Sequence, residues 1–200
     1  MASAQVALPQ NFHAIIKDAD SEIDTSSTEK VFKQLQSGVF LKNNKQKCTY
    51  DQSSNATNFQ LFAKDLIYEG GDWIWDTDSG SGVEVAELES GTSIKVTGNF
   101  DTSKLSPAKT YAVSFTIKMK NDAEGWESPV TMEFDLPTGV IKKITKNLSQ
   151  QRSEVWVKHT IGDFTVPSNG MSGVMKIFLS SSDDKKKKGI VIREIDITAK

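Results

Sequence analysis

The chain has 200 residues, a formal net charge of −2 at pH 7 and 37% hydrophobic residues. This length suits one domain with an extension, and the near-neutral charge excludes a globally basic nucleic-acid binder. No window holds the roughly 18 consecutive apolar residues of a membrane span, so we expect none. Residues 1–9 lack a basic segment followed by a long apolar one, so we expect no signal peptide and a cytoplasmic protein.

The chain has a single cysteine, Cys48, which agrees with that location because one thiol cannot form an internal disulfide. Its basic neighbours Lys45 and Lys47 favour a thiolate. An unreactive thiol on a strand is the alternative interpretation.

Residues 1–56 differ in pattern from the rest of the chain. A short amphipathic helix is predicted over 28–36, ending at Gly38, because its apolar residues fall on one helical stripe. A hairpin is predicted next, with strands over 39–41 and 46–50 and an Asn-containing turn between them.

Acidic residues just before that helix follow the ligand spacing of an EF-hand calcium loop. The sixth loop position needs Gly for its sharp turn, but Ile23 stands there, and 11–17 is too short for a convincing entering helix. We therefore expect a solvated acidic loop and no metal site. The residues at ligand positions are Asp18, Asp20, Glu22, Asp24, Ser26 and Glu29.

Trp73 and Trp75 flank Ile74, so on an extended strand their side chains point to the same side. Asp72 and Asp76 border the pair, and a Gly/Ser-rich loop follows, which is unusual for a buried core strand. The pair is predicted near a rim, where indole covers the C–H face of a sugar ring and carboxylates bond its hydroxyls. The alternative is a pair of hydrophobic plugs at the end of a sandwich.

The remainder of the chain shows strand after strand. The clearest is 111–119, where five apolar residues alternate with small or polar ones, and 130–136 and 190–197 repeat the pattern. About eight to ten short strands at this spacing predict an all-β, jelly-roll-like antiparallel β-sandwich over 57–200, with 1–56 as an N-terminal extension that carries the short helix and hairpin. The expected breaks include Gly98-Asn99 and Pro137-Thr138-Gly139.

Two further tryptophans stand apart from the pair. Trp126 lies in a polar turn over 121–129, so we expect it to be partly exposed and a second ligand candidate. Trp156 lies opposite the face of Val155 and Val157, where the N-terminal segment or a partner subunit would cover it.

No catalytic constellation is visible in the sequence. The two histidines are His13 and His159, and His159 is interpreted as structural. There is no Gly-rich phosphate loop, metal-spaced Cys/His set or nucleophile elbow. A glycosidase pair of carboxylates stays open, because its two acids are set by space and not by sequence. We expect no enzyme activity and no cofactor.

Several ordered segments carry a family resemblance. They are Phe62-Ala63-Lys64-Asp65-Leu66, Trp73-Ile74-Trp75, Val83-Glu84-Val85-Ala86-Glu87-Leu88, Leu105-Ser106-Pro107-Ala108-Lys109-Thr110-Tyr111, Trp156-Val157-Lys158-His159-Thr160-Ile161-Gly162-Asp163-Phe164 and Lys188-Gly189-Ile190-Val191-Ile192-Arg193-Glu194-Ile195-Asp196-Ile197. In this order they resemble the phloem protein 2 family, which includes the Nictaba-type plant lectins. The resemblance covers 57–200, and 34–41 looks like the N-terminal extension of the phloem members.

The resemblance implies a jelly-roll-like sandwich that binds N-acetylglucosamine oligomers (chito-oligosaccharides) and the N-glycan cores of glycoproteins without enzyme activity. It also implies a nucleocytoplasmic or sieve-element location. The family commonly has a further Trp soon after Asp65-Leu66, whereas here 67–71 has none and Tyr68 takes its place. The candidate carbohydrate-binding residues are Trp73, Trp75, Tyr68, Asp72, Asp76 and Trp126.

The size of the stacking effect adds an expectation about the ligand. One sugar face hides roughly 100 Å² of apolar surface, so a single stack contributes about 2.5 kcal/mol, whereas millimolar binding needs about 4 kcal/mol. The site should therefore span two or more sugars, or gain avidity through a homodimer.

A protein-binding or RNA-binding module without sugar binding is the alternative function. It is supported by Asp183-Asp184-Lys185-Lys186-Lys187-Lys188, where four consecutive lysines resemble a nuclear address or a phosphate patch. A solvated hairpin loop is the other interpretation of this run.

Overall fold

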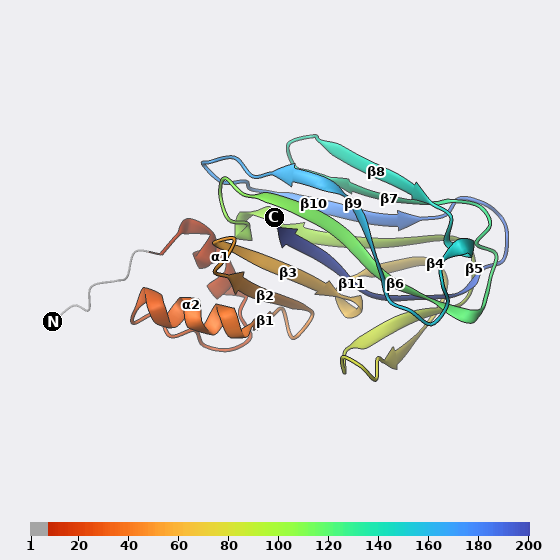
Figure 1. Cartoon of the computed structure of the whole chain (residues 1–200), viewed down its shortest axis with the longest axis horizontal. Helices are drawn as coiled ribbons and strands as arrows, with labels where there is room; N and C mark the ends of the chain where they lie inside the picture. The colour runs from red at the N-terminus through yellow and green to blue at the C-terminus, as the bar shows by residue number, and fades with distance from the viewer. Residues whose placement is uncertain (1–7) are drawn as a thin grey trace.

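The structure is a computed structural model that describes residues 8–200 (Figure 1). The expected absence of a signal peptide concerns residues 1–9, of which 1–7 lie outside the described residues. Within 8–200, no helix is long and apolar enough to cross a bilayer.

The described chain begins with two helices and continues with strands and short 3-10 turns. The helices are α1 (Gln10–Asp18) and α2 (Thr28–Ser37); the strands are β1 (Val39–Leu41), β2 (Gln46–Asp51), β3 (Ala56–Phe62), β4 (Ile67–Thr77), β5 (Glu84–Asp101), β6 (Thr110–Glu124), β7 (Val130–Asp135), β8 (Ile141–Lys146), β9 (Val157–Thr165), β10 (Val174–Ser180) and β11 (Lys188–Ala199); the 3-10 turns are η1 (Ala63–Asp65), η2 (Thr102–Lys104) and η3 (Leu148–Gln150).

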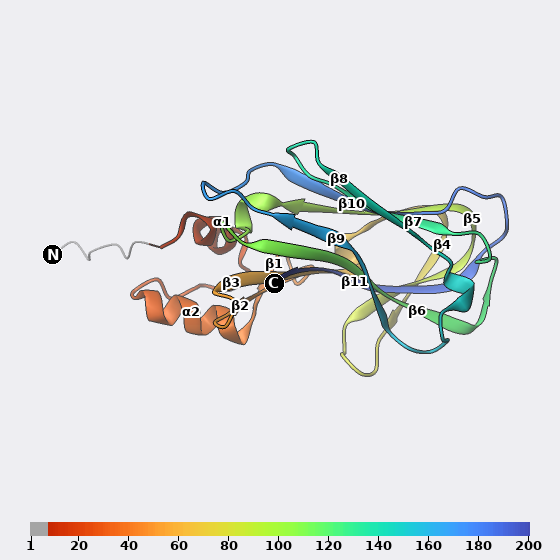
Figure 2. The same ribbon diagram turned by 45° about the horizontal axis from the view of Figure 1, so that its top comes forward.

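Hydrogen bonds join the strands into one 11-stranded antiparallel sheet, which folds over into two facing layers (Figures 1 and 2). One layer holds β1, β2, β3, β11, β6 and β9, and β10, β7 and β8 lie in the other. The long β5 connects them, because its first half pairs with β11 and its second half pairs with β10. The predicted antiparallel β-sandwich is confirmed.

The core forms where the alternation of β6 predicted it. Tyr111, Val113, Phe115, Ile117 and Met119 are at most 3% exposed, while β11 on one side and β9 on the other satisfy the backbone of this strand. Each such side chain contributes about 1.5 to 3 kcal/mol when it is fully buried, so this strand anchors both layers.

Two expectations about strands were wrong. The break expected at Gly98 lies inside β5, where a Cβ on Gly98 would come within 2.6 Å of the Ile195 side chain. This glycine permits close packing and does not mark a turn. β8 was missed, since its side chains are mostly exposed and lysine-rich and give no apolar alternation, as befits the edge of a sheet.

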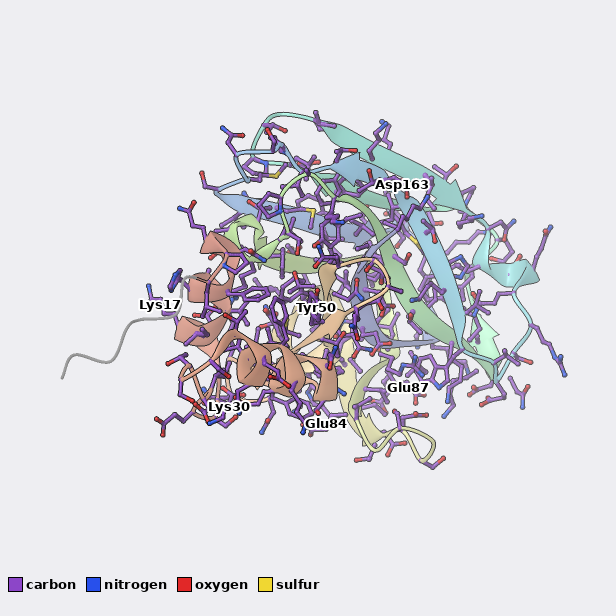
Figure 3. All side chains as sticks on the ribbon, turned by 60° about the vertical axis from the view of Figure 1, so that its left-hand side comes forward. Lys17, Lys30, Tyr50, Glu84, Glu87 and Asp163 are labelled. Atoms are coloured by element: carbon purple, nitrogen blue, oxygen red, sulfur yellow. The ribbon has the colours of Figure 1, made fainter. Side chains whose placement is uncertain are left out.

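In the N-terminal extension, α2 and the following hairpin form as predicted, with the Ser27 hydroxyl capping the helix by accepting from the Lys30 N–H at 3.2 Å. The prediction missed α1, whose Phe12 packs edge-on against Phe32 with ring centroids 5.2 Å apart. The Phe32 ring centroid in turn lies 4.6 Å from that of Tyr50 of β2, which Figure 3 labels next to α2. Because β2 pairs with β3, the extension continues the main sheet and shares its core.

The acidic residues at the end of α1 and in the loop that follows it make separate contacts with other parts of the chain. The carboxylate of Asp20 accepts from the Asn43 and Asn44 backbone N–H groups, both at 2.7 Å, and Asp18 pairs with buried Lys104 at 2.5 Å. Asp24 pairs with Lys30 at the start of α2. Within residues 8–200 no group of three or more His, Cys, Asp or Glu side chains is placed to hold a metal ion.

Cys48 lies fully buried on β2, and burial raises the pKa of its thiol to about 12. The positive charge of Lys104 acts in the opposite direction, but the loss of water on burial outweighs it. The prediction of an unreactive strand thiol is therefore the correct one of the two.

Candidate functional site

β4 and β5 form a long hairpin whose tip projects from the sandwich, in yellow at the bottom of Figure 1. The hairpin bends at Gly70, which has φ +81°, and a Cβ there would lie 1.7 Å from the Ser93 carbonyl oxygen. Only glycine allows this close crossing, and the pairing register shifts just after it. The bend turns the second half of the hairpin outward, so that residues 73–77 extend beyond the core.

Trp73 and Trp75 share one face of this second half, as predicted, because both rings contact Tyr68, with centroid distances of 4.7 and 5.6 Å. Their exposures differ. Trp75 is 42% exposed, whereas Trp73 is half-buried against the core, and its indole N–H has no hydrogen-bond partner among the described residues. Both rings were predicted as the platform for a ligand, and the exposed one is that of Trp75.

Tyr68 lies beneath the pair. Its hydroxyl donates to the Ala63 carbonyl oxygen at 2.9 Å, and burial raises its pKa far above the ordinary value. The ring therefore stays neutral and fixed at every physiological pH. It supports the two indoles and offers little surface of its own, so it does not take the place of an exposed Trp.

Lys64 lies over the exposed indole. Its ammonium is 3.9 Å from the centroid of the Trp75 ring and 3.4 Å from a carboxylate oxygen of Glu84, which Figure 3 labels on the hairpin. Both charged groups are largely in water, so the cation–π contact and the ion pair each contribute only about 0.5 to 1 kcal/mol. Lys64 is thus a weakly held cover on one face of Trp75.

The two predicted aspartates are exposed but do not flank the indole as expected. Asp76 alternates with Trp75 along the strand and so points to the opposite face, where it accepts from the Thr77 N–H. Asp72 accepts from the Ser90 hydroxyl at 3.2 Å, across the hairpin. The carboxylate that connects to Trp75, through Lys64, is that of Glu84.

Trp126 is not part of this site, and the expectation that it is partly exposed was wrong. The ring is 2% exposed, and its N–H donates to the Lys188 carbonyl oxygen at 2.8 Å. The Trp126 carbonyl oxygen accepts from the Ser149 N–H, so two remote loops enclose the turn. A ring in this position has no face to offer a ligand.

Comparison with known proteins identifies the family. A family model described as "Phloem protein 2" matches residues 57–199. The chain belongs to this family. Protein PHLOEM PROTEIN 2-LIKE A1 of Arabidopsis thaliana is 34% identical over 210 residues, covering 100% of this chain and 85% of that protein. A protein named Lectin from Luffa acutangula is 28% identical over 204 residues, covering 96% of this chain and 98% of that protein.

Among solved structures, a family 35 carbohydrate-binding module from Clostridium thermocellum overlaps with a TM-score of 0.43 at 14% identity, covering 72% of this chain and 98% of that one. This overlap concerns the arrangement of strands and not the ligand. The membership expected from the ordered motifs is confirmed, and with it the link to a family that includes lectins.

Sequence reasoning missed the residues that surround Trp75 in this phloem protein 2 chain. Lys64 and Glu84 stand inside two of the segments that carried the resemblance, so the signal was present but had no chemistry attached to it. Phe40 was placed only in a hairpin strand, and the structure leaves its ring 42% exposed. These three residues meet only through the fold.

The lysine run at the β10–β11 loop is largely engaged by acidic residues. Lys187 is buried and pairs with Asp183, while Lys185 lies 3.5 Å from Glu127 and Lys188 lies 3.6 Å from Asp122. A run whose positive charges are neutralised this way presents a weaker phosphate-binding surface than its sequence suggests.

Two groups bear on possible acid-base chemistry. Burial, reinforced by Asp196, raises the pKa of Glu194, but Glu194 also accepts from Arg193 at 3.0 Å. His159 shares a 2.8 Å hydrogen bond with Gln151, and burial lowers its pKa. Arg193 of β11 holds Glu194, Gln151 after η3 holds His159, and neither group lies in the Trp75 hairpin.

Trp156 is half-buried. Its N–H donates to Asp78 of the β4–β5 loop at 3.1 Å, and the side chains of Lys118 and Arg193 lie over its ring at 4.7 and 5.0 Å. None of these contacts comes from the described part of the N-terminal extension, and cover by a partner subunit stays a prediction. Trp156 therefore anchors the tip of the hairpin to the sheet.

Proposed function

We propose that the protein is a non-catalytic lectin that binds N-acetylglucosamine oligomers, and the chitobiose cores of N-glycans, on the hairpin that carries Trp75. The observation that supports this most is the exposed Trp75 ring on a rigid support. Tyr68 contacts the Trp75 ring and is itself packed against Trp73, so the Trp75 ring does not have to be ordered when a ligand binds.

The neighbouring groups suit a neutral polar ligand. Lys64 and Glu84 balance each other's charge beside the ring, and the Glu84 carboxylate can accept from sugar hydroxyls or an acetamido N–H once the ligand has displaced Lys64 from the indole. That displacement costs about 1 kcal/mol, to be set against about 2.5 kcal/mol from one sugar stack. A single sugar should therefore bind more weakly than millimolar, and useful affinity requires further contacts.

The absence of hydrolysis is also part of the proposal. Glu84 is the carboxylate that reaches this site, and its partner is a lysine and not a second acid. Both glycosidase mechanisms need two carboxyl groups on the two sides of the scissile bond, about 5 to 9.5 Å apart. A bound oligomer should thus be released intact.

Titration calorimetry of the whole protein with chitotetraose tests the binding. We expect a dissociation constant in the micromolar to millimolar range, and we expect Trp75→Ala to weaken binding by about 1 to 3 kcal/mol, or roughly 5- to 150-fold. Ile141→Ala is a matched control, because this apolar side chain is also exposed but lies on β8. It should bind as the wild type does.

Mass analysis of the same mixture after long incubation tests the lack of hydrolysis. Intact chitotetraose is expected, whereas shorter oligomers would refute the non-enzymatic reading. Equal affinity of the wild type and Trp75→Ala would refute the site. The homodimer and the cytoplasmic, sieve-element or nuclear location stay predictions.

A further inference from the structure

A recess of about 590 Å³ lies beside the Trp75 hairpin, between the β1–β2 turn and the β4–β5 loop. Its walls include the rings of Phe40 and Phe62, the side chain of Lys64, and residues 43–45 and 81–84. Phe40 and residues 43–45 belong to the N-terminal extension, whereas residues 81–84 belong to the hairpin. The recess therefore forms only when the two regions come together.

The recess follows from the way β11 changes partners. Val191 and Ile192 of β11 pair with β5, and Glu194–Ile197 of the same edge pair with β3. Between these two stretches, the pairing of the other edge of β11 with β6 shifts register. The end of β3 and the start of β5 thus meet the same edge of β11 without pairing with each other. An open space remains where the strands diverge.

The aromatic wall is unusual for a surface strand. Phe40 is 42% exposed on β1, and its ring centroid lies 6.4 Å from that of Phe62. Phe62 is buried and supports Phe40 from the side, so the exposed Phe40 ring is the one that provides stacking surface for the C–H face of a sugar. The Lys47 ammonium lies 5.6 Å from the centroid of the Phe40 ring, and the rest of the exposed ring surface is in water, so a ligand that excludes this water gains affinity.

The polar wall is fixed in advance. Lys42, Asn43 and Asn44 all have left-handed backbone angles, with φ between 55° and 61°. Asp20 holds the turn in this form by accepting two of its backbone N–H groups, both at 2.7 Å. The two Asn residues therefore line the recess from a turn that needs no reordering, and amides both donate to and accept from sugar hydroxyls and acetamido groups.

Lys64 connects the recess to Trp75, because its side chain lines the recess while its ammonium lies 3.9 Å over the indole ring. One flexible side chain separates the two surfaces. When a ligand displaces Lys64, the recess and the exposed ring become one continuous site, and an oligomer can contact both.

We propose that this recess is a second sugar subsite, which takes an N-acetylhexosamine unit of the same oligomer that stacks on Trp75. This inference rests on the proposed function and adds a role for the N-terminal extension, which would supply Phe40, Asn43 and Asn44 to the ligand. Lys64 and Glu84 offset each other's charge in the lining, and Lys45 is the further charged residue there.

Affinity as a function of oligomer length tests the proposal. For the wild type we expect the association constant to rise about tenfold or more between the shortest oligomer that binds and one long enough to reach both surfaces. Phe40→Ala should flatten this rise while binding of the shortest oligomer stays within about twofold. Val83→Trp, which fills the recess, should do the same, and thermal unfolding verifies that both variants fold.

Ile141→Ala serves as the control again, because it removes an exposed apolar side chain far from the recess and should keep the full rise. The side-chain amide signals of Asn43 and Asn44 in NMR spectra should shift with the longer oligomer and not with the monosaccharide.

The outcomes separate this inference from the proposed function. If Trp75→Ala loses affinity while Phe40→Ala and Val83→Trp keep the wild-type length dependence, the recess is no subsite and the lectin proposal stands. If the wild type binds no oligomer of any length, the proposed function fails and the subsite fails with it.

Discussion

Trp75 and Trp126 both stand in acidic, glycine-containing surroundings beside strong strands, and the fold treats them in opposite ways. Trp75 is 42% exposed on a projecting hairpin, whereas Trp126 is 2% exposed beneath two loops. The hairpin bends outward at Gly70 because the backbone crosses closely there. The Trp126 turn is drawn inward, and a Cβ on Gly125 would lie 2.2 Å from the Lys186 carbonyl oxygen.

The difference shows that the cover of a loop aromatic comes from residues remote in sequence. Ser149 and Lys188, which bond the main chain and the indole of Trp126, lie 23 and 62 positions away from it along the chain. The sequence of the polar turn itself does not indicate these two contacts. Local polarity therefore says that a turn reaches the surface, but not which of its side chains stays there.

The largest effect that would test this comparison is on stability. Trp126→Ala should lower the free energy of unfolding by about 3 to 5 kcal/mol, because it leaves a large cavity and an unpaired carbonyl oxygen. Urea unfolding followed by circular dichroism measures it. The chitotetraose affinity of the folded protein should not change.

A loss of sugar affinity in folded Trp126→Ala would contradict the contrast, since it would place the buried ring in the ligand site. Trp75→Ala is the matched control for stability, because removing a side chain that is 42% exposed should cost much less than removing one that is 2% exposed.

Trp73 lies between the two extremes, so its substitution should affect both quantities. Trp73→Ala should cost about 2 kcal/mol of unfolding free energy, since the half-buried ring packs against the core, and it should also weaken sugar binding by removing the support of Trp75. Trp73→Phe should restore much of the stability, because the lost indole N–H has no partner among the described residues. Urea unfolding and calorimetry on both variants decide this, and unaltered sugar affinity in Trp73→Ala would show that Trp75 needs no support.

The periodic parts of the fold were predictable because the spacing of apolar residues along a strand or helix indicates which of its side chains are buried. The alternation of 111–119 gave the core face of β6, and the stripe of 28–36 gave α2. α1 has no side-chain cap at its start, and β8 has exposed residues on both faces, so neither displays the expected pattern. The sequence around Gly98 suggests a turn, but a glycine is required there because the Ile195 side chain, 97 positions away along the chain, packs closely against it.

The candidate site was predictable only in its aromatic part. Spacing placed Trp73 and Trp75 on one face, which the structure confirms through their shared contacts with Tyr68. Which ring is exposed depends on the bend at Gly70, and the contribution of Lys64 depends on the turn after β3. Such relations arise from tertiary packing, so no local pattern encodes them.

A smaller effect concerns the cover on Trp75. Lys64→Ala should raise the affinity for the shortest oligomer by about three- to tenfold, because the ligand no longer has to displace an ammonium from the ring. Calorimetry measures this affinity. Added salt should reduce the difference in affinity between the wild type and Lys64→Ala, because salt screens the ion pair between Lys64 and Glu84. Lys95→Ala is the matched control, since Lys95 lies 4.6 Å over Phe178 on another part of the sheet. Reduced affinity in Lys64→Ala would mean that the lysine binds the sugar and does not cover the ring.

The smallest effect concerns the tip of the hairpin. Polar contacts hold this tip in place, whereas burial holds the Trp126 turn in place. Asp78 accepts from the Ser81 hydroxyl and N–H and from the Trp156 indole, and these bonds, the Ser81 hydroxyl first, lower its pKa below the ordinary value. The folded state therefore binds this proton less readily than the unfolded state, so the charged form stabilises the fold above the unfolded pKa of about 3.9. That contribution is lost as the pH falls through the lower folded pKa. The carboxylate is close to water, so the effect should stay below about 1 kcal/mol.

The difference in unfolding free energy between the wild type and Asp78→Asn should be constant from pH 7 to about pH 5 and should shrink below about pH 4. A difference that does not change with pH down to 2.5 would show that the charge of Asp78 does not hold the hairpin, and that its hydrogen bonds alone do.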